Sequence, residues 1–318
     1  MAIAWFVLKR LAGMVVTLFV VTIAVFGLLD LSPGSLVATL LGNHPASPAV
    51  VAAITVRYHL DDPFPVRYLD WLTSALHGDF GQSVQSGENV SALIGEHLPI
   101  TLQVALYALV LVVVIGIPAG MLAGMRRGGV LDKTISGVAV VAMSAPAFAI
   151  GILLIYVLGV RLSVFPVFGA GDAGFVDRIS HLTLPALALA ATLVALLVRQ
   201  TRAAVLNVMS QDYITFARAR GLSRPRILLQ YALRNTALPV TTATGLMLIA
   251  AIAGTVLVEQ VFSLPGIGNL MVQSVDAKDV PVVQGVALCV GAFVVVVNFL
   301  VDMAALAIDP RTRTAAKG

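Results

Sequence analysis

The chain has 318 residues, of which 59% are hydrophobic and only 11% are charged, and its formal net charge at pH 7 is +4. Soluble globular chains average about 25% charged residues, so a protein core alone cannot hide this much apolar surface, and a lipid bilayer is the expected solvent. No basic stripe with interleaved aromatic residues is present, which argues against nucleic acid as a partner. The single cysteine, Cys289, excludes an intrachain disulfide framework, and we interpret it as a packing residue.

The first apolar segment covers 11–29 and follows Lys9 and Arg10. A basic start before an apolar run is also typical of a cleaved signal peptide. This run, however, is as long as a membrane span, and no small-residue cleavage site follows it. We therefore expect an uncleaved first transmembrane helix.

Five further apolar segments lie at 100–125, 135–160, 182–198, 237–262 and 282–308. Each is close to or above the ~20 residues that cross a hydrocarbon core of ~30 Å. The predicted fold class is therefore an all-α polytopic membrane protein with six transmembrane helices. The expected organisation is a cytoplasmic N-terminus with the first helix (1–31), an extracytoplasmic helical segment (32–98), a five-helix core (99–310) that includes a cytoplasmic loop (199–235), and a cytoplasmic tail (311–318).

Positive charge sets the expected orientation. Fifteen of the 20 lysines and arginines fall in the segments that six spans place on the same side as the termini. Both termini are therefore predicted to be cytoplasmic, in a plasma-type inner membrane. The outer segment 32–98 carries six acidic residues together with Tyr68 and Trp71. It is interpreted either as a small helical subdomain on the membrane surface or as a solvated loop with one interfacial helix, and either could receive an external partner.

Small and polar residues within the spans suggest packing and pathway roles. Pro118 and Pro146 remove backbone hydrogen bonds, which marks either a pathway or a kink. Three threonines of the fifth helix line a pathway or bond to their own helix: Thr241, Thr242 and Thr244. Three glycines four residues apart predict a smooth face on which another helix packs closely: Gly116, Gly120 and Gly124.

Ionisable groups are scarce inside the spans. Glu259 and Asp302 lie near predicted helix ends, and no histidine falls in the middle of a span. A stand-alone secondary transporter would need internal coupling groups and an internal repeat, and a membrane enzyme would need a polar catalytic cluster. We therefore expect no catalytic residues, no metal site and no cofactor in this chain. None of its four lysines follows a glycine, so it has no phosphate-binding loop, and the energy source is expected to be external.

The loop 199–235 is predicted to contain a short helix. Ser210 or Asp212 can cap its start, Gly221 fits its C-terminal stop, and Pro225 begins a second helix. Small residues exposed on it, Ala217 and Gly221, would permit close approach of another protein, with the surrounding arginines fixing the orientation. The alternative is a basic loop that only anchors topology.

The text Ala-Arg-Ala-Arg-Gly-Leu-Ser at 217–223 resembles the cytoplasmic motif of permease subunits of binding-protein-dependent ABC importers, in the dipeptide/oligopeptide/nickel branch. Aligning Gly221 with the glycine of the general E-A-A-x-x-x-G motif places Thr215, Phe216 and Ala217 at the E-A-A positions, where only Ala217 matches. The stretches at 60–63, 78–83, 98–102, 259–268 and 309–311 resemble the first of the two permeases of that branch.

The resemblance implies a type I ABC importer permease fold and a set of partners. These are a second homologous permease, two cytoplasmic ATP-binding subunits that use ATP and Mg²⁺, an extracytoplasmic substrate-binding protein and the lipid bilayer. Peptides are the default substrate, and nickel complexes, haem or glutathione are the alternatives. Nine residues are expected to couple the chain to the ATPase subunits: Asp212, Tyr213, Thr215, Phe216, Ala217, Arg218, Ala219, Arg220 and Gly221.

Overall fold

The computed structural model describes residues 2–31, 47–57 and 60–308. The predicted tail at 311–318 and the start of the outer segment, 32–46, lie outside the described residues. The described chain is helical, with one isolated antiparallel bridge between Gln82 and Asn89. It divides into two compact units: unit 1 comprises Met1–Val7, Thr101–Leu264 and Val297–Gly318, and unit 2 comprises Leu8–Ile100 and Pro265–Val296.

Five helices in the described part of the chain are long and apolar enough to cross a membrane. They are α1 (Ala2–Leu31), α5 (Val90–Met125), α8 (Phe175–Met209), α11 (Leu233–Phe262) and α13 (Val280–Ile308). They contain the predicted first, second, fourth, fifth and sixth segments. The fourth segment, predicted at 182–198, is extended at both ends within α8, because its polar flanks continue the same helix beyond the apolar stretch.

The third predicted segment, 135–160, is broken. It forms α6 (Val130–Ser144) and α7 (Ala147–Leu154), and α7 continues as a π-helical stretch, η1 (Ile155–Arg161). The two halves are bent by 98°, and a sixth crossing results only if they count as one span. Pro146 causes the break: it precedes the first turn of α7, and the residue before it, Ala145, is extended, as a residue before proline prefers to be.

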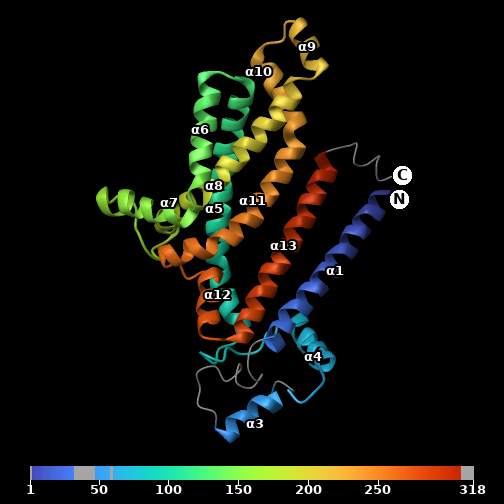
Figure 1. Ribbon diagram of the computed structural model, residues 1–318, viewed down its shortest axis with the longest axis vertical. Coiled ribbons are helices and arrows are strands. Elements are labelled where there is room, and N and C mark those ends of the chain that lie inside the picture. Colours follow the sequence, from blue (N-terminus) through green and yellow to red (C-terminus); the bar gives the residue numbers. More distant parts are fainter. Residues whose placement is uncertain (1, 32–46, 58–59, 309–318) are drawn as a thin grey trace. The chain divides into compact units, whose positions relative to one another are not determined.

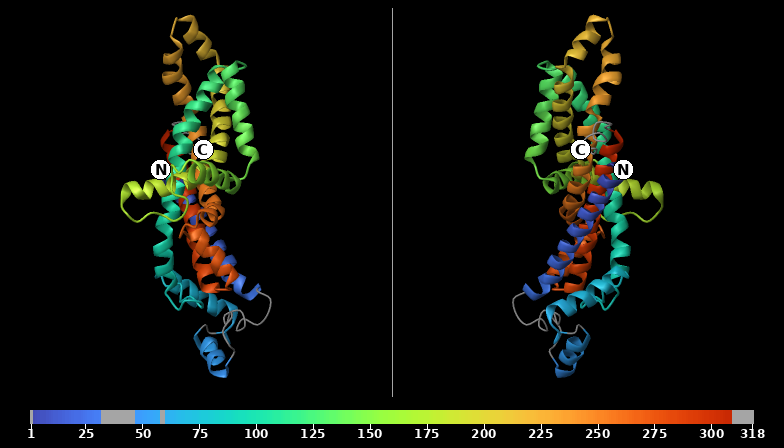
Figure 2. Two further views of the ribbon diagram at one scale, coloured as in Figure 1. Left: turned by 90° about the vertical axis from the view of Figure 1, so that its left-hand side faces the viewer. Right: turned by 90° about the vertical axis from the view of Figure 1, so that its right-hand side faces the viewer.

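Unit 1 is built around α8, which packs against α6, α7 and α11. Small residues form one of its cores, with Ala139 of α6 against Ala195 and Val198 of α8. Beyond α8 come α9 (Asp212–Ala219) and α10 (Arg224–Ile227), and a π-helical turn, η2 (Leu228–Ala232), leads into α11. Figures 1 and 2 show α9 and α10 at one end of this unit and α7 projecting to its side.

Unit 2 contains α3 (Pro48–Arg57), α4 (Phe64–Leu76) and α12 (Ile267–Asp276) together with parts of α1, α5 and α13. Aromatic rings pack α4 against α1: the ring centroid of Phe26 lies 5.4 Å from that of Phe64 and 5.4 Å from that of Trp71. The hydroxyls of Tyr68 and Thr22 form a hydrogen bond of 2.8 Å. The described part of the outer segment thus contains α3, α4 and the start of α5, with a non-helical stretch at 77–89.

A buried carboxylate orders the turn between α4 and α5. Asp279, only 2% exposed, accepts a hydrogen bond from the Ser83 hydroxyl at 2.5 Å and from the backbone amides of Val84 and Gln85 at 3.2 Å. Several donors on one carboxylate satisfy its charge without a cation. The motif at 78–83 is therefore a structured turn fixed to the start of α13.

Candidate functional site

The start of α9 follows α8 almost directly. Gln211 is the N-cap residue, and Ser210 is the C-cap of α8 with φ −89° and ψ −3°. The expectation that Ser210 or Asp212 caps the helix is therefore wrong, because Ser210 still belongs to the end of α8 and Asp212 is already inside α9. In the first turn, the Asp212 carboxylate has a favourable place next to the positive end of the helix dipole.

Gly221 ends α9 in the way the sequence predicts. Its φ is +76°, which lies in the left-handed region that glycine adopts readily and L-amino acids rarely adopt. Its amide donates to the carbonyl of Arg218 at 2.9 Å, and the amide of Leu222 donates to that of Ala217 at 3.2 Å, which is the Schellman pattern. Apart from its neighbours in the chain, no described residue has an atom within 4 Å of the position a Cβ would take, so the backbone conformation, and not lack of space, requires the glycine.

One face of α9 is buried within this chain. Ile214 and Ala217 are 0% and 3% exposed, and they pack in a cluster with Val208 of α8, Ile227 of α10 and Ala232 of η2. The expectation that Ala217 lies on an exposed contact surface is therefore wrong. Residues three apart share a helix face, and Ile214 requires that face to point into the cluster. Ala217 fixes α9 to its own unit.

The opposite face of α9 carries an exposed aromatic ring. Phe216 is 69% exposed, although α9 lies outside the candidate membrane spans. Tyr213 is 40% exposed and stacks on Tyr231 with ring centroids 6.3 Å apart. The other predicted coupling residues on the surface are Asp212, Thr215, Arg218, Ala219, Arg220 and Gly221. An exposed aromatic ring among arginines has the composition of a protein–protein contact.

A cationic cavity adjoins α9. It has a volume of about 630 Å³, and Arg218 of α9 lines it together with Arg126 and Arg127 from the turn between α5 and α6. Three guanidinium groups around one cavity would attract acidic side chains, and arginine pairs with carboxylates in a two-pronged geometry. Loop spacing alone could not predict this cavity, because its arginines lie far apart in the sequence.

The predicted glycine face of α5 lies on α8. A Cβ on Gly116 would lie 3.1 Å from the Leu197 side chain, and one on Gly124 would lie 2.7 Å from that of Val205. A Cβ on Gly120 would lie 2.6 Å from the Thr201 Cβ and 2.7 Å from the Val198 carbonyl oxygen. Side chains at these positions would separate the two helices, so the stripe permits close backbone approach.

An ion pair that the sequence analysis missed joins α6 to α8. Arg202 Nε donates to Asp132 Oδ1 at 2.6 Å, and its Nη2 donates to Oδ2 at 2.8 Å. The amide of Gly128 also donates to Oδ2 at 2.9 Å, and Asp132 is only 3% exposed. In the sequence, this ion pair was indicated only by the position of one acidic residue, Asp132, within a basic inner segment. Unit 1 therefore has a polar contact close to the end that carries α9.

Glu259 is fully buried in the last turn of α11. Thr101 of α5 donates its hydroxyl hydrogen to Glu259 Oε1 at 2.6 Å. The predicted position near a helix end is correct, and the partner on a distant helix is new.

The threonines of α11 divide into two groups. Thr241 and Thr244 line an apolar cavity of about 420 Å³ between α5, α11 and α13, whereas Thr242 does not line it. Thr242 and Thr244 donate their hydroxyl hydrogens to the carbonyls of Leu238 at 3.1 Å and Val240 at 2.8 Å. These hydroxyls bond to their own helix, and a pathway-lining role for the three threonines stays a prediction.

The sequence matches two family models along almost its whole length. Residues 116–314 match the binding-protein-dependent transport system inner membrane component, and residues 3–105 match the N-terminal part of such membrane components. The chain belongs to this family. It is accordingly a permease component of a binding-protein-dependent importer and a multi-pass membrane protein.

Curated relatives of this permease cover nearly its full length. The dipeptide transport system permease protein DppB of Escherichia coli K12 is 33% identical, over 97% of this chain and 98% of its own. A probable peptide ABC transporter permease, y4tP of Sinorhizobium fredii, is 35% identical over 97% and 99%. A putative peptide permease of Brucella suis biovar 1 is 37% identical over 93% and 95%.

A solved structure supports the fold of this permease. The inward-facing MetNI methionine ABC transporter matches with a TM-score of 0.58 and 19% identity, over 68% of this chain and 96% of the other. At that identity the likeness concerns the fold, which is the type I importer permease fold that the sequence predicts.

Proposed function

We propose that this permease forms one half of a transmembrane pathway for di- or oligopeptides. The proposal rests on its relatives, which are named as dipeptide and peptide permeases. The other half would be a second, homologous permease, and an extracytoplasmic binding protein would deliver the peptide. Nickel complexes, haem and glutathione are the alternative cargoes, which competition with unlabelled peptide would distinguish.

Energy would come from two cytoplasmic ATP-binding subunits that use ATP and Mg²⁺, because this chain has no phosphate-binding loop of its own. In this proposal both termini are cytoplasmic and the protein lies in the inner membrane, as the distribution of positive charge favours. The end of unit 1 that carries α9 is then the cytoplasmic end.

One observation carries the coupling role: α9 is fixed to its own chain through Ile214 and Ala217 and presents Phe216 on the opposite face. A helix that is rigidly anchored and exposes an aromatic ring outward can transmit the movement of a bound partner. The cavity lined by Arg126, Arg127 and Arg218 would receive acidic side chains of the same ATPase subunit. Closure of the ATPase subunits on ATP would displace α9, and with it α8, to open the pathway outward.

The experiment compares Phe216→Asp with Phe216→Leu in the assembled importer. Phe216→Asp should weaken ATPase binding about thirtyfold, the effect of losing a central contact of about 2 kcal/mol, while Phe216→Leu should lower it far less. Co-purification of the ATPase subunits measures this. The thermal stability of the isolated permease should stay unchanged in both variants, because the side chain is 69% exposed. Normal co-purification of Phe216→Asp would exclude α9 as the docking helix.

A further inference from the structure

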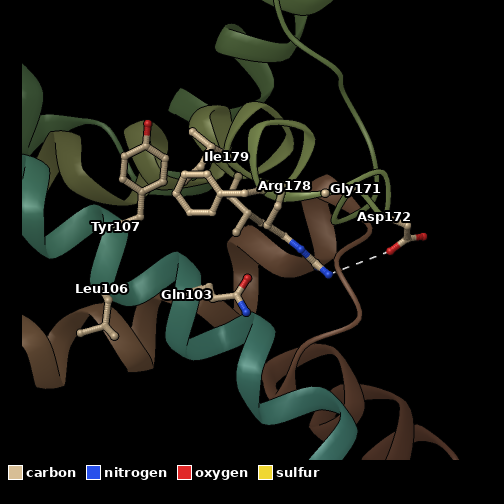
Figure 3. Close-up of a pocket in the computed structure, with 10 residues that line it drawn as sticks. Gln103, Leu106, Tyr107, Gly171, Asp172, Arg178 and Ile179 are labelled. Carbon is tan, nitrogen blue, oxygen red and sulfur yellow. Dashed lines mark ion pairs between the residues drawn. The ribbon is translucent and has the colours of Figure 1, made fainter.

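A second cavity lies in unit 1 at the end of α8 opposite to α9. Its volume is about 520 Å³, within the range of small-molecule sites. The first turns of α8, the loop before them and α5 form its walls, and Figure 3 shows Arg178 extending from α8 toward Asp172 with Gln103 of α5 on the same side. No part of the coupling proposal uses this cavity.

Arg178 is a cation with an unsatisfied donor. Its Nη1 is buried and has no hydrogen-bond partner in the described part of the chain, whereas buried donors of this kind are nearly always paired. Its Nη2 lies 4.0 Å from Asp172 Oδ1, at the limit of an ion pair, and the Asp172 side chain is fully exposed. An exposed pair at this distance neutralises little charge. The guanidinium group therefore has capacity for an anionic ligand.

Another arginine of unit 1, Arg161, is held by a neighbouring tyrosine. Arg161 donates from Nε and Nη2 to the Tyr156 hydroxyl oxygen at 2.9 and 2.7 Å, and it lies 5.3 Å from the centre of that ring. Arg178 has no comparable partner among the described residues. The two arginines therefore form a pair for an experiment: Arg161 is exposed and donates to a tyrosine hydroxyl, whereas Arg178 has a buried nitrogen with no partner among the described residues.

The walls of the cavity are apolar and exposed. Leu106 of α5 is 51% exposed, and Phe175 and Ile179 of α8 are 80% and 37% exposed. Arg178 is the fourth residue of a helix long and apolar enough to span the membrane, which places it near the end of the span. Arginines at this position lie at the depth of lipid head groups. The site thus combines one cationic group at head-group depth with an apolar surface beside it.

We propose that this cavity binds a phospholipid, with the head-group phosphate on Arg178 and the acyl chains along Leu106 and Ile179. A phosphate offers the oxygen acceptors that a guanidinium fork requires. A free phosphate ion would satisfy Arg178 but leave the apolar wall uncovered. A phospholipid would bind the Arg178 guanidinium with its phosphate and cover the apolar wall with its acyl chains.

The test uses the full importer complex, delipidated in mild detergent and titrated with phosphatidylglycerol, with bound lipid counted by native mass spectrometry. Arg178→Gln should lower the affinity for this lipid about fivefold, the effect of one arginine near a charged head group, while Arg161→Gln should leave it unchanged. Equal lipid binding by Arg178→Gln and the wild type would overturn the proposal.

Two further measurements keep the outcome decisive. If Arg178→Gln fails to fold, Ile179→Ser should weaken lipid binding without removing the charge, and full retention in that variant would contradict the assignment. Inorganic phosphate should neither displace the lipid nor stabilise the wild type specifically. Displacement of the lipid by inorganic phosphate would show a free-anion site in place of a lipid site.

Discussion

Within α9 and the turn that ends it, some residues are required for the backbone conformation and others are available for contact with a partner. Gly221 is required by its backbone conformation, Ala217 by its burial, and Phe216 by neither. The family motif contains a residue of each kind within a few positions. Substitutions in this motif are therefore expected to act in different ways, through backbone strain, loss of buried packing or loss of a surface contact.

Gly221→Val should weaken ATPase binding, because a β-branched residue at φ +76° introduces backbone strain of about 1–3 kcal/mol and unwinds the end of α9. Gly221→Asn should bind nearly normally, since asparagine tolerates the left-handed conformation. Co-purification of the ATPase subunits with each variant measures the difference. Equal binding by the valine and asparagine variants would show that the conformation is unimportant.

Asp132→Asn should destabilise the permease by roughly 3 kcal/mol, because the Arg202 guanidinium would lose its bidentate partner in a largely buried site. The double variant Asp132→Leu with Arg202→Met should recover most of that loss, since two apolar side chains leave no unpaired charge. Thermal unfolding in detergent would report both. A double variant as unstable as Asp132→Asn would mean that the loss does not come from the unpaired charge of Arg202.

At the scale of helices, the glycine face of α5 and the break at Pro146 show two ways in which small features of the sequence determine packing. The glycines remove side chains where α5 crosses α8. Pro146 turns α7 away from α6 by 98°. Both features were visible in the sequence. The glycine spacing predicted close helix packing, whereas Pro146 did not predict the size of the bend.

Gly120→Ala should destabilise the permease by about 1–3 kcal/mol, because the added methyl group would lie 2.6 Å from Thr201 Cβ and 2.7 Å from a backbone oxygen. Gly137→Ala in α6 is the matched control: no atom lies within 4 Å of its Cβ position, so alanine should be neutral or slightly stabilising there. Thermal unfolding of the two variants should differ clearly in midpoint. A similar midpoint in both would contradict close packing at Gly120.

Much of the helical framework could be predicted because apolar length is a local property of the sequence. The segments at 11–29, 100–125, 237–262 and 282–308 each lie within one helix. Proline 146 was recognised, but the size of the bend was not, because a proline allows both a kink and a break. The end of α9 at Gly221 was also predictable, because a glycine C-cap depends only on the residues of the last helical turn.

Contacts between distant segments could not be predicted from the sequence. Asp132 and Arg202 are 70 residues apart, and Thr101 and Glu259 are 158 apart. Nothing in one chain's sequence pairs such residues. The burial of Ala217 was missed for a related reason: its surroundings come from α8, α10 and η2, which the loop sequence alone does not place.

At the scale of the whole molecule, transport should need more than this chain. Proteoliposomes that contain the permease alone should show no uptake of labelled dipeptide. Those that contain both permeases, the ATPase subunits and the binding protein should show ATP-dependent uptake, because the proposed function assigns ATP hydrolysis to the partner subunits. Omitting ATP from the complete assembly is the control. Uptake by the permease alone under an ion gradient would instead indicate a secondary transporter.

The continuity of α8 has a mechanical consequence. It runs for 35 residues as one helix in spite of Pro185, which makes it about 52 Å long. α9, the proposed coupling helix, adjoins one end of α8, and the Arg178 cavity adjoins the other. If closure of the ATPase subunits moved one end of α8 while a bound lipid held the other, the helix would pivot. A lipid bound beside Arg178 would then be the point about which α8 tilts. The lipid composition of the bilayer would influence how far α8 tilts when the ATPase subunits close.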